Sequence, residues 1–379
     1  MTVKAPVFAI VAGEASGDVL GADLIRGLKR IFPNASFEGI GGDKMKAEGF
    51  NSLHDMERLS VMGFIEPLKR ISELLNIRRS IIKRYKTSPP LVFIGIDSPD
   101  FTTHIELKLK QIGIKTAHYV SPSVWAWRQG RIKKIKRAVD LMLTLLPFEA
   151  AFYRQHKVPV RFVGHPLATE LNSQPEVSDA RKRLGLDLNQ PLLCVMPGSR
   201  SGEVALLAKL FIAVARDVTN KIKNLHVVVP AANEARHRQL QEILSAQKSV
   251  NITLILRNSH LAMAASDAVL LASGTTALEA MLLKKPMVVS YKLGKITHAL
   301  VSPFIKTPYV SIPNLLANEM LVPELIQENA TLEKLSFAVH EALSENNKRH
   351  LLERFEGIQS SLTLKSGDLA AQAILELLE

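Results

Sequence analysis

The sequence predicts a protein of two α/β domains, each built around a parallel β-sheet. Its 379 residues exceed what one hydrophobic core usually organises, so two domains of ordinary size are expected. Apolar residues make up 47% and charged residues 22%, which is the composition of a globular protein and not of a disordered chain. Short apolar runs alternate with helical patterns along the chain, and this alternation is typical of βαβ units.

Seven of these runs are expected to form strands, because each is short, ends near Gly, Ser, Asp or Pro and leads into a helical pattern. In the first half they read VFAIVAG, LVFIGID, TAHYVSP and LMLTLLP, and in the second LLCVMPGS, LHVVVPA and DAVLLASG. The rhythm stops at VGHPLATELNSQPEVSDARKRLGLDLNQP, where Pro, Asn, Ser and charged residues replace the apolar runs. We therefore predict a first domain over residues 1–168, a second over 169–345 and a helical tail over 346–379, which could pack on either domain.

The charge balance narrows the classes of partner. A formal net charge of +12 points to an anionic partner such as nucleic acid, an anionic membrane face or a phosphorylated substrate. The single cysteine, Cys194, lies in the apolar run PLLCVMP and excludes a disulfide framework or a cysteine-based metal site. No run reaches the roughly 18 apolar residues of a spanning helix, and the first residues lack a signal-peptide cleavage pattern. We expect a cytoplasmic protein.

Two strand ends of the second domain carry phosphate-binding chemistry. In MPGSRSGEV, Gly198 permits close backbone approach, Ser199 offers a hydroxyl, and Arg200 offers a planar fork suited to phosphate oxygens at a helix start. An ordinary turn with a solvated Arg is the alternative. The second loop, LLASGTTALEAML, contributes a similar turn and an acidic residue one helical turn later that could accept hydrogen bonds from ribose hydroxyls, or could simply complement the helix dipole. Its predicted ligand residues are Ser273, Gly274, Thr275 and Glu279.

Two strand ends of the first domain also carry candidate site residues. In LVFIGIDSPDF, Asp97 follows a strand directly and is placed to take a proton from an attacking hydroxyl. The loop of VAGEASGDVLGA opens a helix after the first strand and brings Glu14, Ser16 and Gly17 to the same edge of the sheet. Neither domain has a GxxxxGK[ST] loop, which disfavours a P-loop nucleotidase.

The segment LSVMGFIEPLKRISELLNIRRSIIKRYK, residues 59–86, is more apolar and more basic than a core-facing helix needs. Apolar insertion together with attraction to anionic head groups is how peripheral proteins bind a membrane. Core packing of the apolar stripe is the alternative. The predicted membrane-contact residues are Val61, Met62, Phe64, Ile65, Leu68, Arg78 and Arg79.

Several stretches together resemble the lipid-A-disaccharide synthase family of Gram-negative bacteria. They are VAGEASGDVLGA, GIDSPDF, HYVSPSVWAWRQGRIKKI, LPFE, PGSRSGEV, LLASGTTALEAML and YVSIPNLLA, in this order from about residue 8 to residue 320. The resemblance implies the GT-B architecture, in which two Rossmann-like domains face each other across a cleft and a C-terminal helix crosses back. It also implies an inverting glycosyltransferase of lipid A biosynthesis.

The implied reaction joins UDP-2,3-diacylglucosamine to the 6-hydroxyl of 2,3-diacylglucosamine 1-phosphate (lipid X). The products would be a β-1,6-linked disaccharide 1-phosphate and UDP. The resemblance implies no cofactor and no metal, since Arg200 and helix N-termini would neutralise the departing diphosphate. Because both substrates are membrane lipids, it implies a peripheral protein on the inner face of the inner membrane.

Carried over residue by residue, the resemblance assigns roles to the positions above. Asp97 becomes the general base or an essential carboxylate, and Asn314 of SIPNLLA lies close to the donor. The remaining assignments are diphosphate contacts for Gly198, Ser199 and Arg200, a nucleoside and phosphate clamp for Ser273, Gly274, Thr275 and Glu279, and a cleft wall for Glu14, Ser16 and Gly17.

The stretch YVSPSVWAWRQGRIKKIKRA holds both tryptophans and a basic run without an acid. A basic rim would help to capture anionic lipid, whereas Trp125 and Trp127 either shape the acceptor region or lock the loop by packing.

Two other functions would account for part of these features. A nucleic-acid-binding protein would also be basic, but no RNP, KH or zinc pattern supports it and we expect no nucleic acid as partner. Another UDP-sugar transferase or epimerase would share the uridine clamp and differ on the acceptor side. A homodimer through the C-terminal part stays open.

Overall fold

The chain folds into two compact units. The computed structural model describes residues 5–59, 66–126, 129–173, 175–245, 251–294, 297–299, 302–304, 307–344 and 348–379, with the backbone only for 66–70. The first unit comprises Met1–Pro166 and Leu362–Glu379, and the second comprises Leu167–Ser361. Each is an α/β unit with an all-parallel sheet, so the predicted fold class is confirmed at this level.

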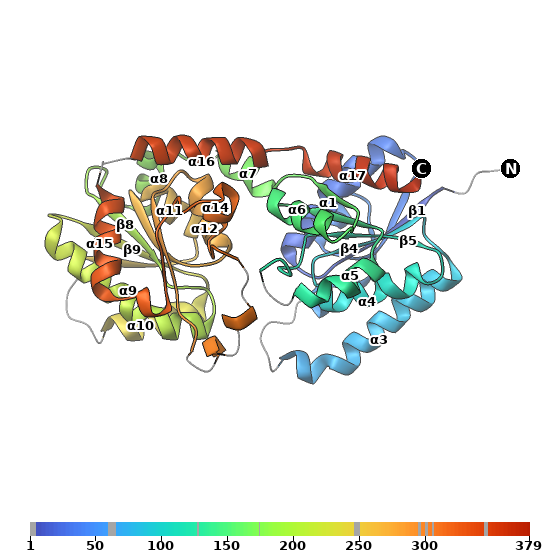
Figure 1. The fold of residues 1–379 in the computed structure, drawn as a ribbon, viewed down its shortest axis with the longest axis horizontal. Coiled ribbons are helices and arrows are strands. Elements are labelled where there is room, and N and C mark those ends of the chain that lie inside the picture. The colour runs from blue at the N-terminus through green and yellow to red at the C-terminus, as the bar shows by residue number, and fades with distance from the viewer. Residues whose placement is uncertain are drawn as a thin grey trace. The chain divides into compact units, whose positions relative to one another are not determined.

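The first unit contains a seven-stranded sheet in the order β3-β2-β1-β4-β5-β6-β7. Strands β1, β4 and β5 of this sheet are labelled in Figure 1. Its elements are β1 Val7–Ala12, α1 Ala15–Ile31, β2 Ser36–Gly41, α2 Asp43–Ala47, β3 Asn51–Asp55, η1 Met56–Arg58, α3 Glu66–Thr87, β4 Val92–Ile96, α4 Pro99–Lys110, β5 Lys115–Tyr119, η2 Gln129–Arg131, α5 Ile132–Ala138, β6 Leu141–Thr144, α6 Pro147–Gln155, β7 Val160–Phe162 and, from the C-terminus, α17 Ser366–Leu378.

Strand β1 shows why this sheet carries helices on both faces. Successive side chains of a strand point to opposite faces. Phe8, Ile10 and Ala12 join the core beneath α1 and α17, whereas Ala9 and Val11 join the core beneath α3 and α4. All five side chains are fully buried, which explains the continuous apolar run that predicted this strand.

The second unit contains a six-stranded sheet in the order β10-β9-β8-β11-β12-β13. Its elements are α7 Pro166–Glu170, η3 Leu171–Ser173, α8 Val177–Leu184, β8 Leu192–Met196, α9 Ser201–Lys221, β9 His226–Ala231, α10 Glu234–Ser245, β10 Ile252–Leu256, α11 Ser259–Ala265, β11 Ala268–Ala272, α12 Thr275–Leu282, β12 Met287–Tyr291, η4 Ser302–Phe304, α14 Ile312–Ala317, β13 Glu324–Ile326, η5 Gln327–Asn329, α15 Leu332–Leu343 and α16 Lys348–Leu362.

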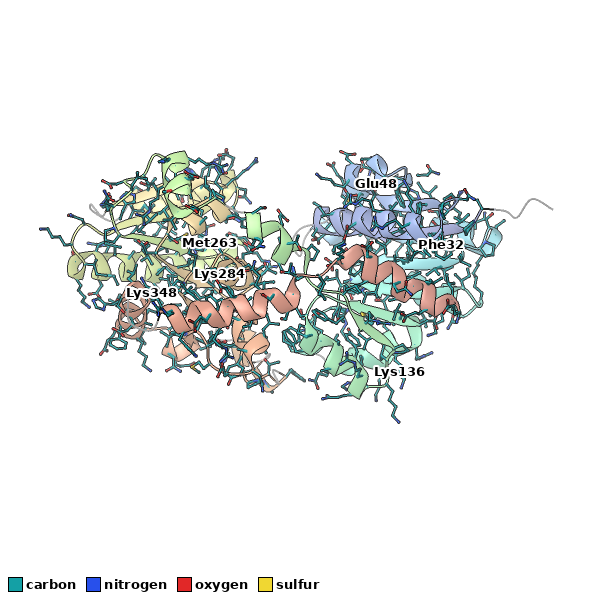
Figure 2. The ribbon with its side chains drawn as sticks, turned by 90° about the horizontal axis from the view of Figure 1, so that it is seen from above. Phe32, Glu48, Lys136, Met263, Lys284 and Lys348 are labelled. Carbon is teal, nitrogen blue, oxygen red and sulfur yellow. The ribbon has the colours of Figure 1, made fainter. Side chains whose placement is uncertain are left out.

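The C-terminal helices divide between the two units, which the sequence left open. Helix α16 belongs to the second unit, where Lys284, labelled beside it in Figure 2, donates a hydrogen bond to Gln359. Helix α17 returns to the first unit and packs along α1. The two helices touch through glycine: a Cβ on Gly27 would lie 2.4 Å from the carbonyl oxygen of Gly367. The Gly367 N–H donates to Asp23 Oδ2 (2.7 Å), which ties the start of α17 to α1.

In the part of the chain that the structure describes, no helix combines the length and the apolar composition needed to cross a bilayer.

The contact between α1 and α17 predicts the effect of adding one methyl group. Gly27→Ala places a Cβ against the backbone of Gly367, and overpacking of this kind costs about 1–3 kcal/mol. We expect a thermal midpoint several degrees below that of the wild type in a calorimetric scan. Gly357→Ala in α16 is the matched control, since its Cβ meets nothing within 4 Å and alanine favours the helix. Equal midpoints for the two variants would contradict this account of the packing.

Candidate functional site

The predicted site loops lie at the two points where strand order reverses. The first unit reverses between β1 and β4, and the second between β8 and β11. Loops that leave neighbouring strands in opposite directions open a crevice at the carboxyl edge of a parallel sheet, where ligands of such folds bind. Glu14 follows β1 and Asp97 follows β4, while Gly198 follows β8 and Ser273 follows β11.

A cavity of about 560 Å³ occupies this edge of the second unit. Its wall comes from the loops after β8, β9, β10 and β11, with the first turn of α12. The structure brings together seven residues that the sequence predicted as donor contacts: Gly198, Ser199, Arg200, Ser273, Gly274, Thr275 and Glu279.

The loop after β8 is held by Glu203, a residue that sequence reasoning missed. Its Oε2 accepts hydrogen bonds from the backbone N–H groups of Ser199 and Arg200 (both 3.2 Å), and its Oε1 accepts from Arg200 Nη1 (2.9 Å). Gly198 has φ +124°, and a Cβ there would lie 2.6 Å from the Cβ of Glu203. A Glu three residues after a helix N-cap was the signal available in the sequence. The loop is thereby ordered while the Arg200 side chain stays 81% exposed.

The corner between β10 and α11 adds a wall that no motif predicted. Arg257 (φ 61°) and Asn258 (φ 56°) are consecutive non-glycine residues in the left-handed region, and both line the cavity. The Arg257 N–H donates to the carbonyl of Ala231 (2.7 Å), which fixes the corner against β9. Backbone strain of this kind persists where the surroundings enforce it and clusters at functional sites.

Glu279 is paired with a histidine from the same corner. His260 Nε2 lies 3.1 Å from Glu279 Oε2, and the two side chains are 33% and 17% exposed. The hydrogen bond to Glu279 raises the pKa of His260 against the opposing effect of burial.

Asn314 does not line the cavity. Its side chain is fully buried, with Nδ2 donating to the Val322 carbonyl (2.9 Å) and to Glu324 Oε1 (2.8 Å), and Oδ1 accepting from the Val322 N–H (2.8 Å). Glu324 also accepts from the N–H groups of Val310 and Ser311. Asn314 therefore supports the segment whose Val310 carbonyl accepts from the Ser273 hydroxyl (3.3 Å).

Asp97 lies at the end of β4 in a strained turn. Asp97 (φ 55°) and Ser98 (φ 46°) are both left-handed, and the Asp97 N–H donates to the carbonyl of Tyr119 (2.9 Å). The half-buried Asp97 carboxylate accepts from the Ser98 N–H through Oδ1 (2.7 Å), which leaves Oδ2 for another partner. The turn repeats the backbone arrangement of Arg257 and Asn258 in the second unit.

The loop after β1 adjoins this turn, because a Cβ on Gly13 would lie 2.2 Å from the Ser98 hydroxyl oxygen. Glu14 and Ser16 are exposed there, whereas Gly17 is buried and packs against Ile96 at the end of β4. The structure therefore groups Glu14 and Ser16 with Asp97 at one edge, and gives Gly17 a packing position.

A buried ionisable pair, also missed from the sequence, lies beside this edge. His118 Nδ1 on β5 is 2.7 Å from Glu106 Oε1 on α4, and both side chains are almost fully buried. A Cβ on Gly95 would lie 2.2 Å from the same Glu106 oxygen, so glycine makes room for the pair. Burial opposes protonation of His118, yet the Glu106 carboxylate raises the pKa of His118 overall.

Trp125 is a packing residue. Its indole Nε1 donates to Glu149 Oε1 (3.1 Å), and its ring meets Phe148 edge-on at 4.8 Å. Burial raises the pKa of Glu149 to about 8. Trp127 lies outside the described residues.

The predicted membrane segment is described only in part. Helix α3 packs on its sheet through Ile77, Ile81 and Tyr85, which accounts for one apolar stripe. Arg79 is exposed and Arg78 is half-buried. Val61, Met62, Phe64, Ile65 and the side chain of Leu68 lie outside the described part of the chain.

A larger groove of about 1240 Å³ exists at the opposite edge of the second sheet, beside Pro286 and Pro323, which precede β12 and β13. It lacks the loops at the carboxyl ends of the strands, so the smaller cavity is the better candidate for a ligand site. Among the described residues, no three His, Cys, Asp or Glu side chains are grouped so that they could hold a metal ion.

Comparison with known proteins decides the family. The model of the lipid-A-disaccharide synthetase family matches residues 8–374. The chain belongs to this family. It is 51% identical over 373 residues to the lipid-A-disaccharide synthase of Saccharophagus degradans, covering 98% of this chain and 96% of the relative. It is 52% identical over 371 residues to that of Hahella chejuensis, covering 98% and 94%.

Solved structures place this family member in the GT-B fold class. A UDP-N-acetylglucosamine 2-epimerase from Neisseria meningitidis, bound to UDP-GlcNAc, has a TM-score of 0.61 at 14% identity over 98% of both chains. A protein from Listeria monocytogenes described as a putative UDP-N-acetylglucosamine 2-epimerase has a TM-score of 0.64 at 14% identity, over 98% of this chain and 95% of the Listeria chain. The calicheamicin glycosyltransferase has a TM-score of 0.59 at 13% identity over 99% of both chains. At such identities the likeness shows the fold alone.

The pair of His118 and Glu106 predicts a pH-dependent stability. Because the folded-state pKa of His118 is raised, the pair contributes stability below the ordinary histidine pKa of about 6.5 and loses it as the pH rises through the folded-state value. We expect Glu106→Gln to lower the thermal midpoint more at pH 6 than at pH 9. Glu38→Gln is the control, since its partner Arg84 does not titrate in this range. A deficit that is constant, or larger at pH 9, would contradict the prediction.

Proposed function

We propose that this family member is an inverting glycosyltransferase that joins UDP-2,3-diacylglucosamine to the 6-hydroxyl of 2,3-diacylglucosamine 1-phosphate. The products are the β-1,6-linked lipid A disaccharide 1-phosphate and UDP. The observation that carries the proposal is the family match over residues 8–374, which includes both pairs of strand-end loops. Relatives named lipid-A-disaccharide synthase are about 50% identical over 98% of the chain.

The cavity of the second unit is assigned to the UDP moiety of the donor. Its volume of about 560 Å³ is within the range of roughly 300–1,000 Å³ that is usual for small-ligand sites. The exposed Arg200 guanidinium suits diphosphate oxygens, and Gly198 has no side chain to obstruct them. The 21-residue helix α9 begins immediately afterwards and directs the positive end of its dipole toward the loop. Glu279 is assigned to the ribose hydroxyls.

These groups also stabilise the leaving group. When the glycosidic bond to UDP breaks, negative charge grows on the diphosphate, and fixed donors at that position lower the barrier. The Arg200 guanidinium, which also contacts Glu203, and the dipole of α9 supply this charge compensation, and no metal takes part.

Asp97 is proposed as the general base of the first unit. Attack by the acceptor hydroxyl on the anomeric carbon requires that its proton leave, and a carboxylate within hydrogen-bond reach contributes about 10²–10⁴-fold to such a step. The strained turn at Asp97 and the oxygen not used by the Ser98 N–H support this role.

The test is acceptor-dependent UDP release by the purified protein in detergent and EDTA. Asp97→Asn keeps a hydrogen-bond acceptor but cannot take the proton, so we expect kcat to fall by about 10²–10⁴-fold. The matched control is Asp100→Asn, an exposed carboxylate three residues away whose partner is Arg131. Release that persists in Asp97→Asn would reject the base assignment, and absence of release by the wild type would reject the reaction.

We further propose that the first unit binds the anionic inner face of the membrane through α3 and the basic helix α5, both of which pack against α4. Ile71 of α3 is 45% exposed, and the exposed residues Arg79, Lys83 and Lys86 follow it. Helix α5 buries Ile132, Ile135 and Ala138, and its basic side chains are exposed. Figure 2 labels one of them, Lys136, which points away from the unit. Exposed apolar groups beside clustered cations suit an anionic lipid surface.

Vesicle flotation with phosphatidylglycerol tests the docking surface. Each basic residue near an anionic surface contributes about 1 kcal/mol, so the combined changes Arg78→Glu, Arg79→Glu and Lys83→Glu should weaken binding by about a hundredfold or more, to about background. The control variant combines Lys209→Glu, Lys223→Glu and Arg238→Glu, three exposed positions of the second unit, and changes the net charge by the same amount as the test variant. Equal loss in both variants would show that total charge, and not this surface, governs binding.

A further inference from the structure

We propose that His260 positions Glu279, so that the carboxylate presents its free lone pairs to the two ribose hydroxyls of a uridine diphosphate. The site would then prefer a ribonucleotide over its 2′-deoxy analogue because of His260, although His260 itself contacts neither nucleotide. This inference rests on the proposed UDP site and adds to it the origin of its sugar specificity.

The contact joins two different strand-end corners. His260 is the second residue of α11, and Glu279 is the fifth residue of α12. Their side chains meet at 3.1 Å between Nε2 and Oε2. Glu279 lines the cavity wall together with Asn258 and Ser259, the residues that precede His260. The histidine is thus placed behind a carboxylate that faces the ligand space.

The chemistry of the carboxylate leaves room for this division of labour. An ionised carboxylate offers about four acceptor positions on its two oxygens. The imidazole N–H occupies one of them, on Oε2, and the remaining positions suffice for two vicinal hydroxyls. Without the histidine, the Glu279 side chain would be free to change rotamer. Binding of the ribose would then have to order this side chain, and the lost conformational entropy would weaken binding.

The backbone that delivers His260 is held in a costly conformation. Arg257 and Asn258 are both left-handed, although neither is glycine, and the α11 helix starts directly after them. A turn built only to connect a strand and a helix does not need two such residues in succession. The strained corner leads directly into the first turn of α11, from which His260 reaches Glu279 on α12.

The charges around His260 favour its role as a donor. Glu279 from α12, and Glu170 from α7, both raise the pKa of His260, while burial lowers it. A protonated imidazole carries an N–H on both ring nitrogens, so its Nε2 donates to Glu279.

Isothermal titration with UDP and with 2′-deoxy-UDP separates specificity from folding. A ribose hydroxyl bound by a carboxylate supports a preference for UDP of about tenfold or more in the wild type. For His260→Ala we expect UDP affinity to fall about tenfold, 2′-deoxy-UDP affinity to change less than about threefold, and the preference to vanish nearly completely. His260→Gln keeps an N–H donor and should retain most of the preference.

Two further variants make the result decisive. Glu279→Gln should remove the preference as His260→Ala does, and the double variant should add nothing, because the two residues act through one contact. His340→Ala is the matched control, since His340 is also paired with a neighbouring glutamate but lies in the groove at the opposite edge of the sheet. An unchanged preference in His260→Ala, or equal losses for both nucleotides, would overturn the inference, whereas absence of UDP binding by the wild type would reject the proposed function instead.

Discussion

The site depends on a constraint of parallel sheets: the carboxyl ends of all strands share one edge, and a crevice opens there only where the strand order reverses. Both sheets obey it, with reversals between β1 and β4 and between β8 and β11. Residues nearly 80 positions apart, such as Arg200 and Glu279, line one cavity because β8 and β11 are hydrogen-bonded neighbours. In the first unit, the same constraint brings the Gly13 loop against Ser98, next to Asp97.

Each unit uses one further device at this edge, a pair of consecutive left-handed residues between a strand and a helix. Asp97 with Ser98 precedes α4, and Arg257 with Asn258 precedes α11. In both, the first N–H of the turn bonds back to the neighbouring strand, to Tyr119 and to Ala231. Rigid parallel strands can impose this strain because many ladder bonds hold the strand end in place. The result is a carboxylate or guanidinium set at a defined position on the edge.

Loops at this edge are held by buried or half-buried acids whose role as hydrogen-bond acceptors was not predicted. Glu203 occupies the N–H groups of the Gly198 loop, and Asp18 on α1 accepts from the N–H groups of Gly42, Lys44 and Met45 at the start of α2. Acids buried in this way are stable because each has several donors. The basic side chains of α5, in contrast, are exposed.

The strands β1, β4, β5, β6, β8, β9 and β11 and the class of fold could be predicted from the sequence, as could seven residues of the second unit that the structure places along one cavity. Those strands are interior and mostly buried on both faces, so all of them except β5, which reads KTAHY, leave an apolar run that can be read directly. The edge strands β3, β7 and β13 leave no such run, and β2 is interrupted by Gly39 and Gly41. The edge strand β10 (ITLIL) and the interior, buried strand β12 (MVVSY) do leave apolar runs and were also not predicted. Only the tertiary structure decided that α17 packs on α1, that Asn314 supports a loop and does not face the cavity, and that His260 meets Glu279. Each of these contacts joins residues from separate elements. The order of residues along one chain does not show a reader which elements become neighbours after folding.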